Sequence, residues 1–196
     1  MPCCLSSSTK MATKNILIVP GDGIGQEVTA VGKKVLDKIA AKFGHQFSYD
    51  EALIGHVAIE ATGNPLPDES LEKMKKSDAV LFGAVGHPKY DNDPSAKVRP
   101  EQGLLKMRKE LGLYANLRPI KLFDELLGAS SIKPEILKGA DILFFRELTG
   151  DIYFGEKGRK NNGDTAYDIA EYSRYEVERI ARKAFDAART RRKKLC

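Results

Sequence analysis

Short apolar runs alternate with segments of helical periodicity through the first half of the chain. Ile16–Val19 is a β-branched run of the kind found inside parallel sheets, and a glycine-rich turn at 20–25 follows it. A helix is expected next, because apolar residues then recur every three or four positions on one face; they are Val28, Val31, Val35, Ile39 and Phe43. The pattern predicts a strand–turn–helix unit.

The alternation of strands and helices continues to about residue 100. A second strand is expected within 47–54, a short helix over 67–76 and a buried strand over Ala79–Phe82. A polar loop without periodicity then runs to Pro100, and a loop of this length is often functional. The predicted class is therefore α/β, with a largely parallel or mixed sheet and flanking helices.

The second half begins with a helix over 102–111 and an alternating strand over 113–120. Tyr114, Asn116 and Arg118 share one face of that strand. The apolar strand 142–145 delivers Arg146 at its end, and the Gly-, Asn- and Lys-rich stretch 152–172 is typical of an extended arm. A capping box predicts the last helix, whose core-facing residues would be Val177, Ile180, Ala181, Ala184, Phe185 and Ala188.

Composition sets limits on the class of protein. The chain has 196 residues, of which 42% are hydrophobic, enough for one large domain or parts of two. Its longest apolar runs are a handful of residues, far below the roughly 20 that span a bilayer. Cys3, Cys4 and Cys196 have no spacing that suggests a disulfide or a zinc site. We expect a cytoplasmic protein without a membrane partner.

The charge of +5 is concentrated at the end of the chain. Residues 189–194 contribute five basic side chains, and the rest of the chain balances the 27 acidic ones. Because the chain without these residues is neutral, its basic end is weak evidence for nucleic-acid binding, and we expect no nucleic-acid partner. We expect a flexible N-terminal extension over 1–14, with a short organelle leader as the alternative, a first α/β domain over 15–112 and a second domain over 113–196.

The turn Gly21–Gly25 resembles a dinucleotide-binding fingerprint but lacks its spacing. The third glycine would fall at position 26, which is Gln26. The fold is therefore expected to be other than Rossmann. A glycine-rich turn could still present backbone N–H groups to an anion, and the alternative is a tight strand-to-helix connection without a ligand.

The helix after Pro100 places three different side chains on one face. Glu101, Leu104 and Arg108 are spaced i, i+3 and i+7, so an acid, an apolar contact and a guanidinium would line the same surface. The alternative is an ordinary helix whose Arg108 pairs with Glu101 or Glu110 at the surface.

Two further arginines lie on strands. Arg146 ends a run so apolar that its neighbours are expected to be buried, and a guanidinium there requires an anionic partner. Together with Arg108, Arg118 and Arg146 could cradle two carboxylates, since the planar guanidinium binds each of them through two hydrogen bonds. The alternative is internal pairing of Arg146 with Glu147 or Asp141.

The remaining candidates carry weaker signals. Tyr153 could bring a phenol to the arginines, or it could anchor the arm as a hydrophobic residue. His45, His56 and His87 have no ligand spacing. Asp91 and Asp93 are typical of solvated loop acids, so no metal ligand is expected in this chain.

Five segments carry a family resemblance that covers nearly everything from Asn15 onward. They are ILIVPGDGIGQEV, AVLFGAVGHPKYDN, VRPEQGLLKMRKELGLYANLRPIK, ILFFRELTGDIYFGEKGR and YSRYEVERIARKAFDAARTRRKK. The chain resembles the β-decarboxylating dehydrogenases of the isocitrate/isopropylmalate dehydrogenase family, and within it the members that oxidise 3-isopropylmalate in leucine biosynthesis. The resemblance implies that family's mixed sheet in place of a Rossmann fold.

The resemblance also implies roles for individual residues. Arg108, Arg118 and Arg146 would clamp the malate carboxylates, Tyr153 would be the acid that protonates the enol carbon, and Leu104 would face the isopropyl group. The cofactor side would comprise Ile24, His87, Pro88, Lys89, Glu101 and Leu105. Apolar Leu104 and Leu105 favour an isopropyl tail over the third carboxylate of isocitrate.

The implied reaction is NAD-dependent oxidative decarboxylation of 3-isopropylmalate to 4-methyl-2-oxopentanoate, with Mg²⁺ or Mn²⁺ as a Lewis acid. The implied assembly is a homodimer that exchanges the arm. The chain departs from the pattern at His87 and Asp151, where glycine would be usual, and it ends before the segment that carries the family's lysine and metal-binding aspartates. We therefore expect a truncated, N-terminal half that is inactive alone. The alternatives are a related 2-hydroxy acid substrate and a non-catalytic partner subunit.

Overall fold

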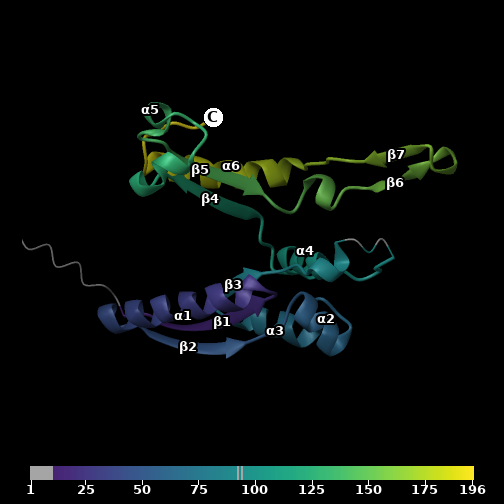
Figure 1. Cartoon of the computed structure of the whole chain (residues 1–196), viewed down its shortest axis with the longest axis horizontal. Coiled ribbons are helices and arrows are strands. Elements are labelled where there is room, and N and C mark those ends of the chain that lie inside the picture. The colour runs from purple at the N-terminus through teal and green to yellow at the C-terminus, as the bar shows by residue number, and fades with distance from the viewer. Residues whose placement is uncertain (1–10, 92, 94) are drawn as a thin grey trace, which may run out of the picture. The chain divides into compact units, whose positions relative to one another are not determined.

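The computed structural model describes residues 11–91, 93 and 95–196, which form two compact units (Figure 1). The first unit extends to Met107 and the second begins at Arg108, whereas the sequence analysis placed the boundary after residue 112. Most of the expected N-terminal extension, with Cys3 and Cys4, lies outside the described residues. The first strand already begins at Thr13, inside the stretch assigned to that extension.

A three-stranded parallel sheet forms the centre of the first unit. Its strands β1 (Thr13–Gly21), β2 (Gln46–Glu51) and β3 (Ala79–Ala84) lie in the order β2-β1-β3. The β-branched run Ile16–Val19 occupies the central strand and is buried, as its apolar pattern predicts. Gly21 pairs with Ala84, so the carboxyl ends of β1 and β3 meet at one edge.

Helix α1 (Ile24–Phe43) connects β1 to β2, and the apolar face predicted for it is exposed. Val31 is 58% exposed and Val35 56%. The buried residues are instead Gly25 and Thr29. A Cβ atom on Gly25 would lie 2.1 Å from the carbonyl oxygen of Pro20, so the helix approaches its own strand too closely for a larger side chain.

Three short helices and α4, whose last three residues are assigned to the second unit, complete the first unit. They are α2 (His56–Thr62), α3 (Asp68–Lys76), the 3₁₀ helix η1 (Pro88–Tyr90) and α4 (Pro100–Glu110). Ile54, Leu66 and Ala58 are fully buried beside the sheet. The sequence analysis predicted α3 and α4 but not α2, which is only seven residues long. Among the described residues, no helix combines the length and apolar character needed to cross a membrane.

The second unit is built on an antiparallel pair of strands. Strands β4 (Ala115–Lys121) and β5 (Asp141–Glu147) are joined through the 3₁₀ helix η2 (Asp124–Ala129) and the short helix α5 (Pro134–Leu137). Helix α6 (Arg174–Arg189) packs against β5. It begins with the predicted capping box, in which the carboxylate of Glu176 accepts a hydrogen bond from the N–H of Ser173 at 2.7 Å.

The core-facing stripe predicted for α6 is only partly correct. Ala184 is buried, whereas Val177 is 52% exposed and Phe185 59% exposed. Only one face of α6 contacts a two-stranded sheet, which is too narrow to cover the whole apolar stripe of a helix.

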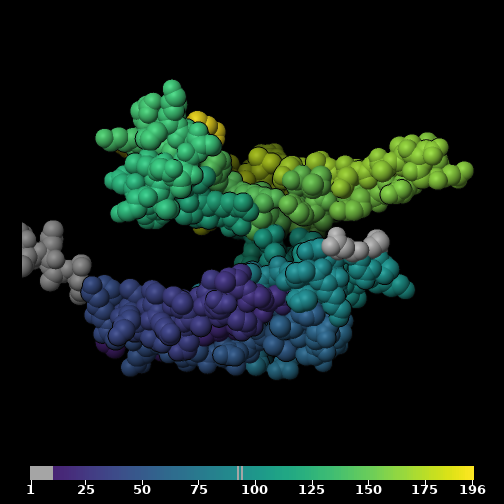
Figure 2. Space-filling view, in the orientation of Figure 1, coloured from purple at the N-terminus to yellow at the C-terminus, as the bar shows by residue number. Residues whose placement is uncertain are grey.

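The predicted arm is a β-hairpin. It comprises the 3₁₀ helix η3 (Asp151–Tyr153), strand β6 (Lys157–Lys160), the turn η4 (Asn161–Gly163) and strand β7 (Thr165–Asp168). Among the described residues the two strands pair only with each other, and in Figure 2 the hairpin is a slender projection of the second unit. An isolated two-stranded hairpin has little stability of its own.

Candidate functional site

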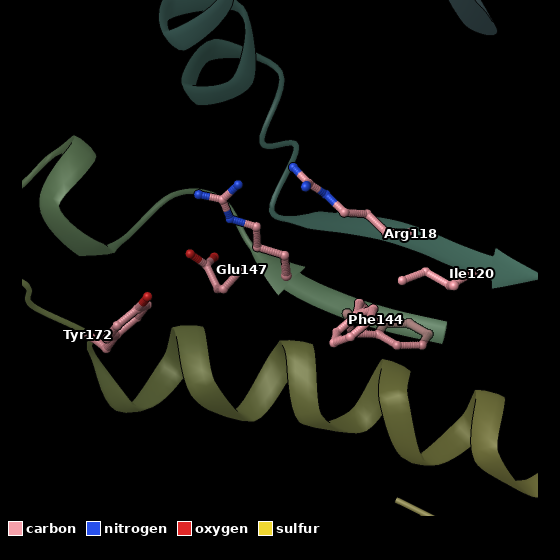
Figure 3. Close-up of a pocket in the computed structure, with 7 residues that line it drawn as sticks. Arg118, Ile120, Phe144, Glu147 and Tyr172 are labelled. Carbon is pink, nitrogen blue, oxygen red and sulfur yellow. The ribbon is translucent and has the colours of Figure 1, made fainter. Parts of the chain in front are cut away.

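The register of β4 and β5 brings two of the predicted arginines to one face. Asn116 is the pairing partner of Arg146, and Arg118 is the partner of Phe144. Directly paired residues of antiparallel strands project on the same side, so both guanidiniums rise from one surface. They line a hollow of about 630 Å³ whose apolar wall includes Ile120 (Figure 3). The amide oxygen of Asn116 accepts a hydrogen bond from Arg118 Nε at 3.0 Å.

Tyr153 lies against Arg146, seven residues further along the chain. Arg146 Nη2 donates a hydrogen bond of 2.7 Å to the phenolic oxygen, and its guanidinium carbon is 5.4 Å from the ring centre. Tyr153 is 39% exposed, and its phenol contacts the arginine with which it was grouped in the sequence.

The third predicted arginine, Arg108, is electrostatically coupled to the same group. Burial lowers the pKa of Arg108, and the positive charges of Arg146 and Arg118 lower it further, while Tyr153 partly offsets them. All three arginines and the tyrosine belong to the second unit, which begins at Arg108.

The internal partners considered for Arg146 are occupied by other arginines. Glu147 pairs with Arg179 at 2.7 Å, and Asp141 pairs with Arg191 at 2.8 Å. Within the part of the chain that the structure describes, none of the three clustered arginines forms an ion pair with a carboxylate. The hollow is thus lined by two guanidiniums without an ion-pair partner in these residues and by the carboxylate of Glu147, which is paired with Arg179.

The cofactor-side candidates belong to the first unit. Ile24 is 60% exposed just after the carboxyl end of β1. His87 follows β3, and its imidazole stacks on that of His56 with 3.9 Å between ring centres. Pro88 and Lys89 are exposed, and Lys89 forms an ion pair with Glu60 at 2.9 Å, which lowers the pKa of Glu60.

The candidates on α4 occupy different environments. Leu104 and Leu105 are half-buried, and Glu101 is exposed. The carboxylate of Glu101 lies 3.4 Å from the position that a Cβ atom on Gly86 would take, so it reaches the segment after β3. The alternative considered for Arg108, a surface ion pair with Glu101 or Glu110, does not form in the described residues.

Sequence reasoning missed the central role of Asp22 in the glycine-rich turn. Asp22 is 3% exposed, and its carboxylate accepts three backbone hydrogen bonds: from His56 at 2.8 Å, from Val57 at 3.1 Å and from Gly86 at 2.9 Å. One side chain thereby joins the turn after β1, the start of α2 and the segment after β3. No local pattern marks such a residue, because its partners are 34 to 64 positions away.

The glycine-rich turn uses several of its own N–H groups internally. Those of Asp22, Gly25 and Gln26 bond to carbonyl oxygens within the unit, and the side chain of Gln26 donates to the carbonyl of Gly21 at 2.8 Å. This arrangement favours the tight connection over an anion-binding turn.

No metal centre is found in the described residues, where no three His, Cys, Asp or Glu side chains converge. Asp93 accepts hydrogen bonds from the hydroxyl and the N–H of Ser95, which lower its pKa. It therefore has a local structural role in the loop.

Comparison with known proteins agrees with these features. The family model described as isocitrate/isopropylmalate dehydrogenase matches residues 15–196. A 3-isopropylmalate dehydrogenase of Rhodopirellula baltica is 55% identical over 183 residues, which cover 92% of this chain and 51% of that protein. One of Bacteroides fragilis is 51% identical, covering 92% and 50%. The chain spans about half the length of the curated relatives it matches.

Solved structures show the same likeness. A β-decarboxylating dehydrogenase of Thermococcus kodakarensis is 32% identical with a TM-score of 0.63, covering 90% of this chain and 46% of the other. An isocitrate dehydrogenase of Methylococcus capsulatus is 29% identical with a TM-score of 0.69, covering 90% and 48%. These matches extend over the strands, helices and arginine cluster described above, and the chain belongs to the isocitrate/isopropylmalate dehydrogenase family.

Proposed function

We propose that the chain carries the substrate half-site of an NAD-dependent 3-isopropylmalate dehydrogenase. The observation that supports it is the set of three guanidiniums with no carboxylate partner in the described residues. A substrate with two carboxylates supplies the missing negative charge, and each carboxylate can accept paired hydrogen bonds from an arginine. The names of the relatives supply the identity of the dicarboxylate.

Tyr153 is assigned the role of general acid in this proposal. Oxidation of the substrate removes a hydride from its hydroxyl-bearing carbon and the proton of the hydroxyl group, which passes to water. Loss of carbon dioxide then leaves an enolate that needs a proton on carbon. NAD supplies the oxidising chemistry by accepting that hydride. The phenol of Tyr153 is held by Arg146 at 2.7 Å, within reach of a ligand bound to the same guanidinium. Arg108 and Arg118 orient the carboxylates.

The cofactor side is proposed on the first unit. Open α/β sheets bind ligands at the carboxyl ends of their strands, and Ile24, His87, Pro88 and Lys89 follow the adjacent strands β1 and β3. Exposed Ile24 offers an apolar contact and Glu101 an acceptor. Gln26 at the position of the third glycine supports a fold distinct from Rossmann. The described residues do not fit a Mg²⁺ or Mn²⁺ site, so no step is assigned to a metal here.

A homodimer is the proposed assembly. The hairpin β6–β7 pairs only with itself, and its outer edges are available to another strand. The proposed organisation is a first domain over 15–112 and a second over 113–196, with the arm exchanged between subunits.

Calorimetric titration of the purified chain with 3-isopropylmalate tests the substrate assignment. Replacing Arg118 by glutamine should weaken binding by about 10- to 100-fold, the value of one hydrogen bond to a charged group. Replacing the exposed Arg182 of α6 by glutamine removes the same charge elsewhere and should leave binding unchanged. Equal affinities of the unaltered chain, the Arg118 variant and the Arg182 variant for 3-isopropylmalate would refute the proposed substrate half-site.

Isocitrate serves as the competing ligand, because solved relatives include an isocitrate dehydrogenase. Half-buried Leu104 favours an isopropyl tail over a third carboxylate. Replacing Leu104 by serine should therefore shift preference toward isocitrate. Tighter binding of isocitrate to the unaltered chain would overturn the substrate while leaving the arginine site intact.

A further inference from the structure

A buried ion pair adjoins the hollow of Arg118 and Arg146, and its carboxylate residue, Glu147, is one of the residues that line that hollow. Glu147 Oε1 is 2.7 Å from Arg179 Nη2, and the two side chains are only 7% and 17% exposed. The other ion pairs of the described residues are far more exposed; that of Lys14 with Asp78, for example, is 52% and 39% exposed. Removing two charges from water is costly, and the best-supported benefit of a buried pair is a defined geometry.

The carboxylate of Glu147 determines the shape of the turn that follows β5. Its Oε2 accepts the N–H of Thr149 at 2.7 Å and that of Gly150 at 2.8 Å, and its Oε1 accepts the Thr149 hydroxyl at 2.7 Å. This turn is the covalent link between Arg146 at the end of β5 and Tyr153 in η3. The conformation of 148–150 therefore decides where the phenol lies relative to the guanidinium.

Arg179 is itself fixed from several sides. Its guanidinium carbon lies 4.5 Å from the ring centre of Tyr114 and 4.6 Å from that of Tyr175, and it donates to the hydroxyl groups of Tyr175 and Thr149. Tyr114 immediately precedes β4, and its carbonyl accepts the N–H of Leu148 at 2.9 Å. The cluster thus joins the start of β4, the end of β5 and helix α6.

The electrostatics agree with a charged pair. Burial alone would raise the pKa of Glu147, but the hydrogen bonds from Thr149, Gly150 and Arg179 outweigh it and the pKa lies below its ordinary value. Glu147 is consequently ionised at neutral pH, which matches the buried positive charge of Arg179.

We propose that Glu147 and Arg179 are positioning residues, which fix the turn 148–150 and thereby hold the phenol of Tyr153 against Arg146. The identity of the ligand at that site rests on the proposed function, whereas the positioning is a property of the chain without ligand. Glu147 lines the same hollow as Arg118 and Arg146, but its charge is paired with that of Arg179, so neither residue is assigned a substrate carboxylate.

Nuclear magnetic resonance of the full chain with ¹³C-labelled tyrosine tests the positioning without ligand. Tyr153→Phe identifies the resonance of Tyr153, and Arg146→Gln gives the displacement that follows loss of the guanidinium–phenol hydrogen bond. Arg179→Met and Glu147→Gln should displace the Tyr153 resonance in the same direction. Arg182→Met, an exposed residue of the same helix, should leave it unchanged.

Binding of 3-isopropylmalate by the same variants separates this inference from the proposed function. Arg179→Met should weaken binding by about tenfold through misplaced contacts, and Arg182→Met should not. If the wild-type chain binds no 3-isopropylmalate while Arg179→Met still displaces the Tyr153 resonance, the proposed function is refuted and the positioning is supported. A folded Arg179→Met variant with an unchanged Tyr153 resonance would overturn the positioning.

Thr149→Val is the milder variant if Arg179→Met does not fold. It keeps the size of the side chain while removing the hydroxyl that connects Glu147 to Arg179. The Tyr153 resonance should move in the same direction by a smaller amount. Circular dichroism verifies the fold, and an unchanged resonance in this folded variant would equally overturn the proposal.

Discussion

Replacing Asp22 by alanine should destabilise the first unit more than any other single loss of a carboxylate there. The side chain is 3% exposed and accepts the N–H groups of His56, Val57 and Gly86 at 2.8–3.1 Å. Each hydrogen bond to a charged acceptor contributes about 1.5–3 kcal/mol. In the variant, water can reach the three N–H groups that lose the carboxylate, which reduces the total loss. We therefore expect a loss of about 3–5 kcal/mol in the free energy of unfolding.

Two further variants calibrate that value. Asp22→Asn can keep the oxygen that serves His56 and Gly86 but places an amide N–H₂ against the N–H of Val57, which should cost about 1–3 kcal/mol. Asp78→Ala is the matched control, because Asp78 also accepts a backbone N–H, that of Asn15, at 2.8 Å but lies at the surface. Its loss should cost about 1 kcal/mol or less.

Urea denaturation followed by far-ultraviolet circular dichroism measures the free energies, and amide hydrogen exchange locates the change. In Asp22→Ala the N–H groups of His56, Val57 and Gly86 should lose protection, while those of the central strand β1 keep theirs. A variant as stable as Asp78→Ala, with the three N–H groups still protected, would refute the conclusion that this carboxylate joins the three segments.

Three other outcomes follow from backbone geometry, electrostatics and packing. Asp151 has a φ of 68°, a left-handed conformation that favours glycine, so Asp151→Gly should raise the free energy of unfolding by about 0.5–1 kcal/mol. Asp164 has a φ of −66°, so Asp164→Gly should lower it by a similar amount. Urea denaturation measures both, and changes of the same sign in the two variants would contradict this reasoning. The pKa of Glu147 in the folded chain lies below its ordinary value of 4.5, so the ionised carboxylate stabilises the fold above pH 4.5, and this contribution is lost as the pH falls through the folded pKa. Glu147→Gln should therefore flatten the pH dependence of the thermal unfolding midpoint below about pH 4.5. An unchanged pH profile in this variant would contradict the argument. Leu36→Ala should lower the free energy of unfolding by about 1–2 kcal/mol and Val35→Ala by less than about 0.5 kcal/mol, because half-buried Leu36 and exposed Val35 occupy different faces of α1. A lower urea midpoint for Val35→Ala than for Leu36→Ala would contradict that assignment.

The strands were the most predictable part of the fold. β1, β3 and β5 each contain an apolar run, and a run of four or five such residues identifies a strand without knowledge of its neighbours. The helix α2 escaped prediction because seven residues are too few to display a period. The pairing of β6 with β7 escaped as well, since their side chains are polar and the pairing depends on the turn between them.

The residues of the candidate site also differ in how far the sequence alone predicts them. Arg118 and Arg146 could be grouped from the sequence because alternation assigns a face and an apolar run makes a charge conspicuous. Asp22 could not, since its three partners come from other loops. Likewise, Glu147 was considered only as a partner for Arg146, and its true partner Arg179 lies 32 residues away on α6. Long-range hydrogen bonds leave no period in the sequence.

Helix α1 shows that the apolar face of a predicted helix need not be the face that contacts the sheet. Hydrophobic periodicity selects the widest apolar stripe, here the valine and isoleucine positions that the structure leaves exposed. The face against the sheet contains Gly25, Thr29 and Gly32, and a Cβ atom on Gly32 would lie 3.4 Å from Leu81. Small residues allow the helix to approach the strands closely, and they contribute little to any hydrophobicity pattern. Close packing and apolar character are therefore separate signals, and the contact face of α1 follows the first.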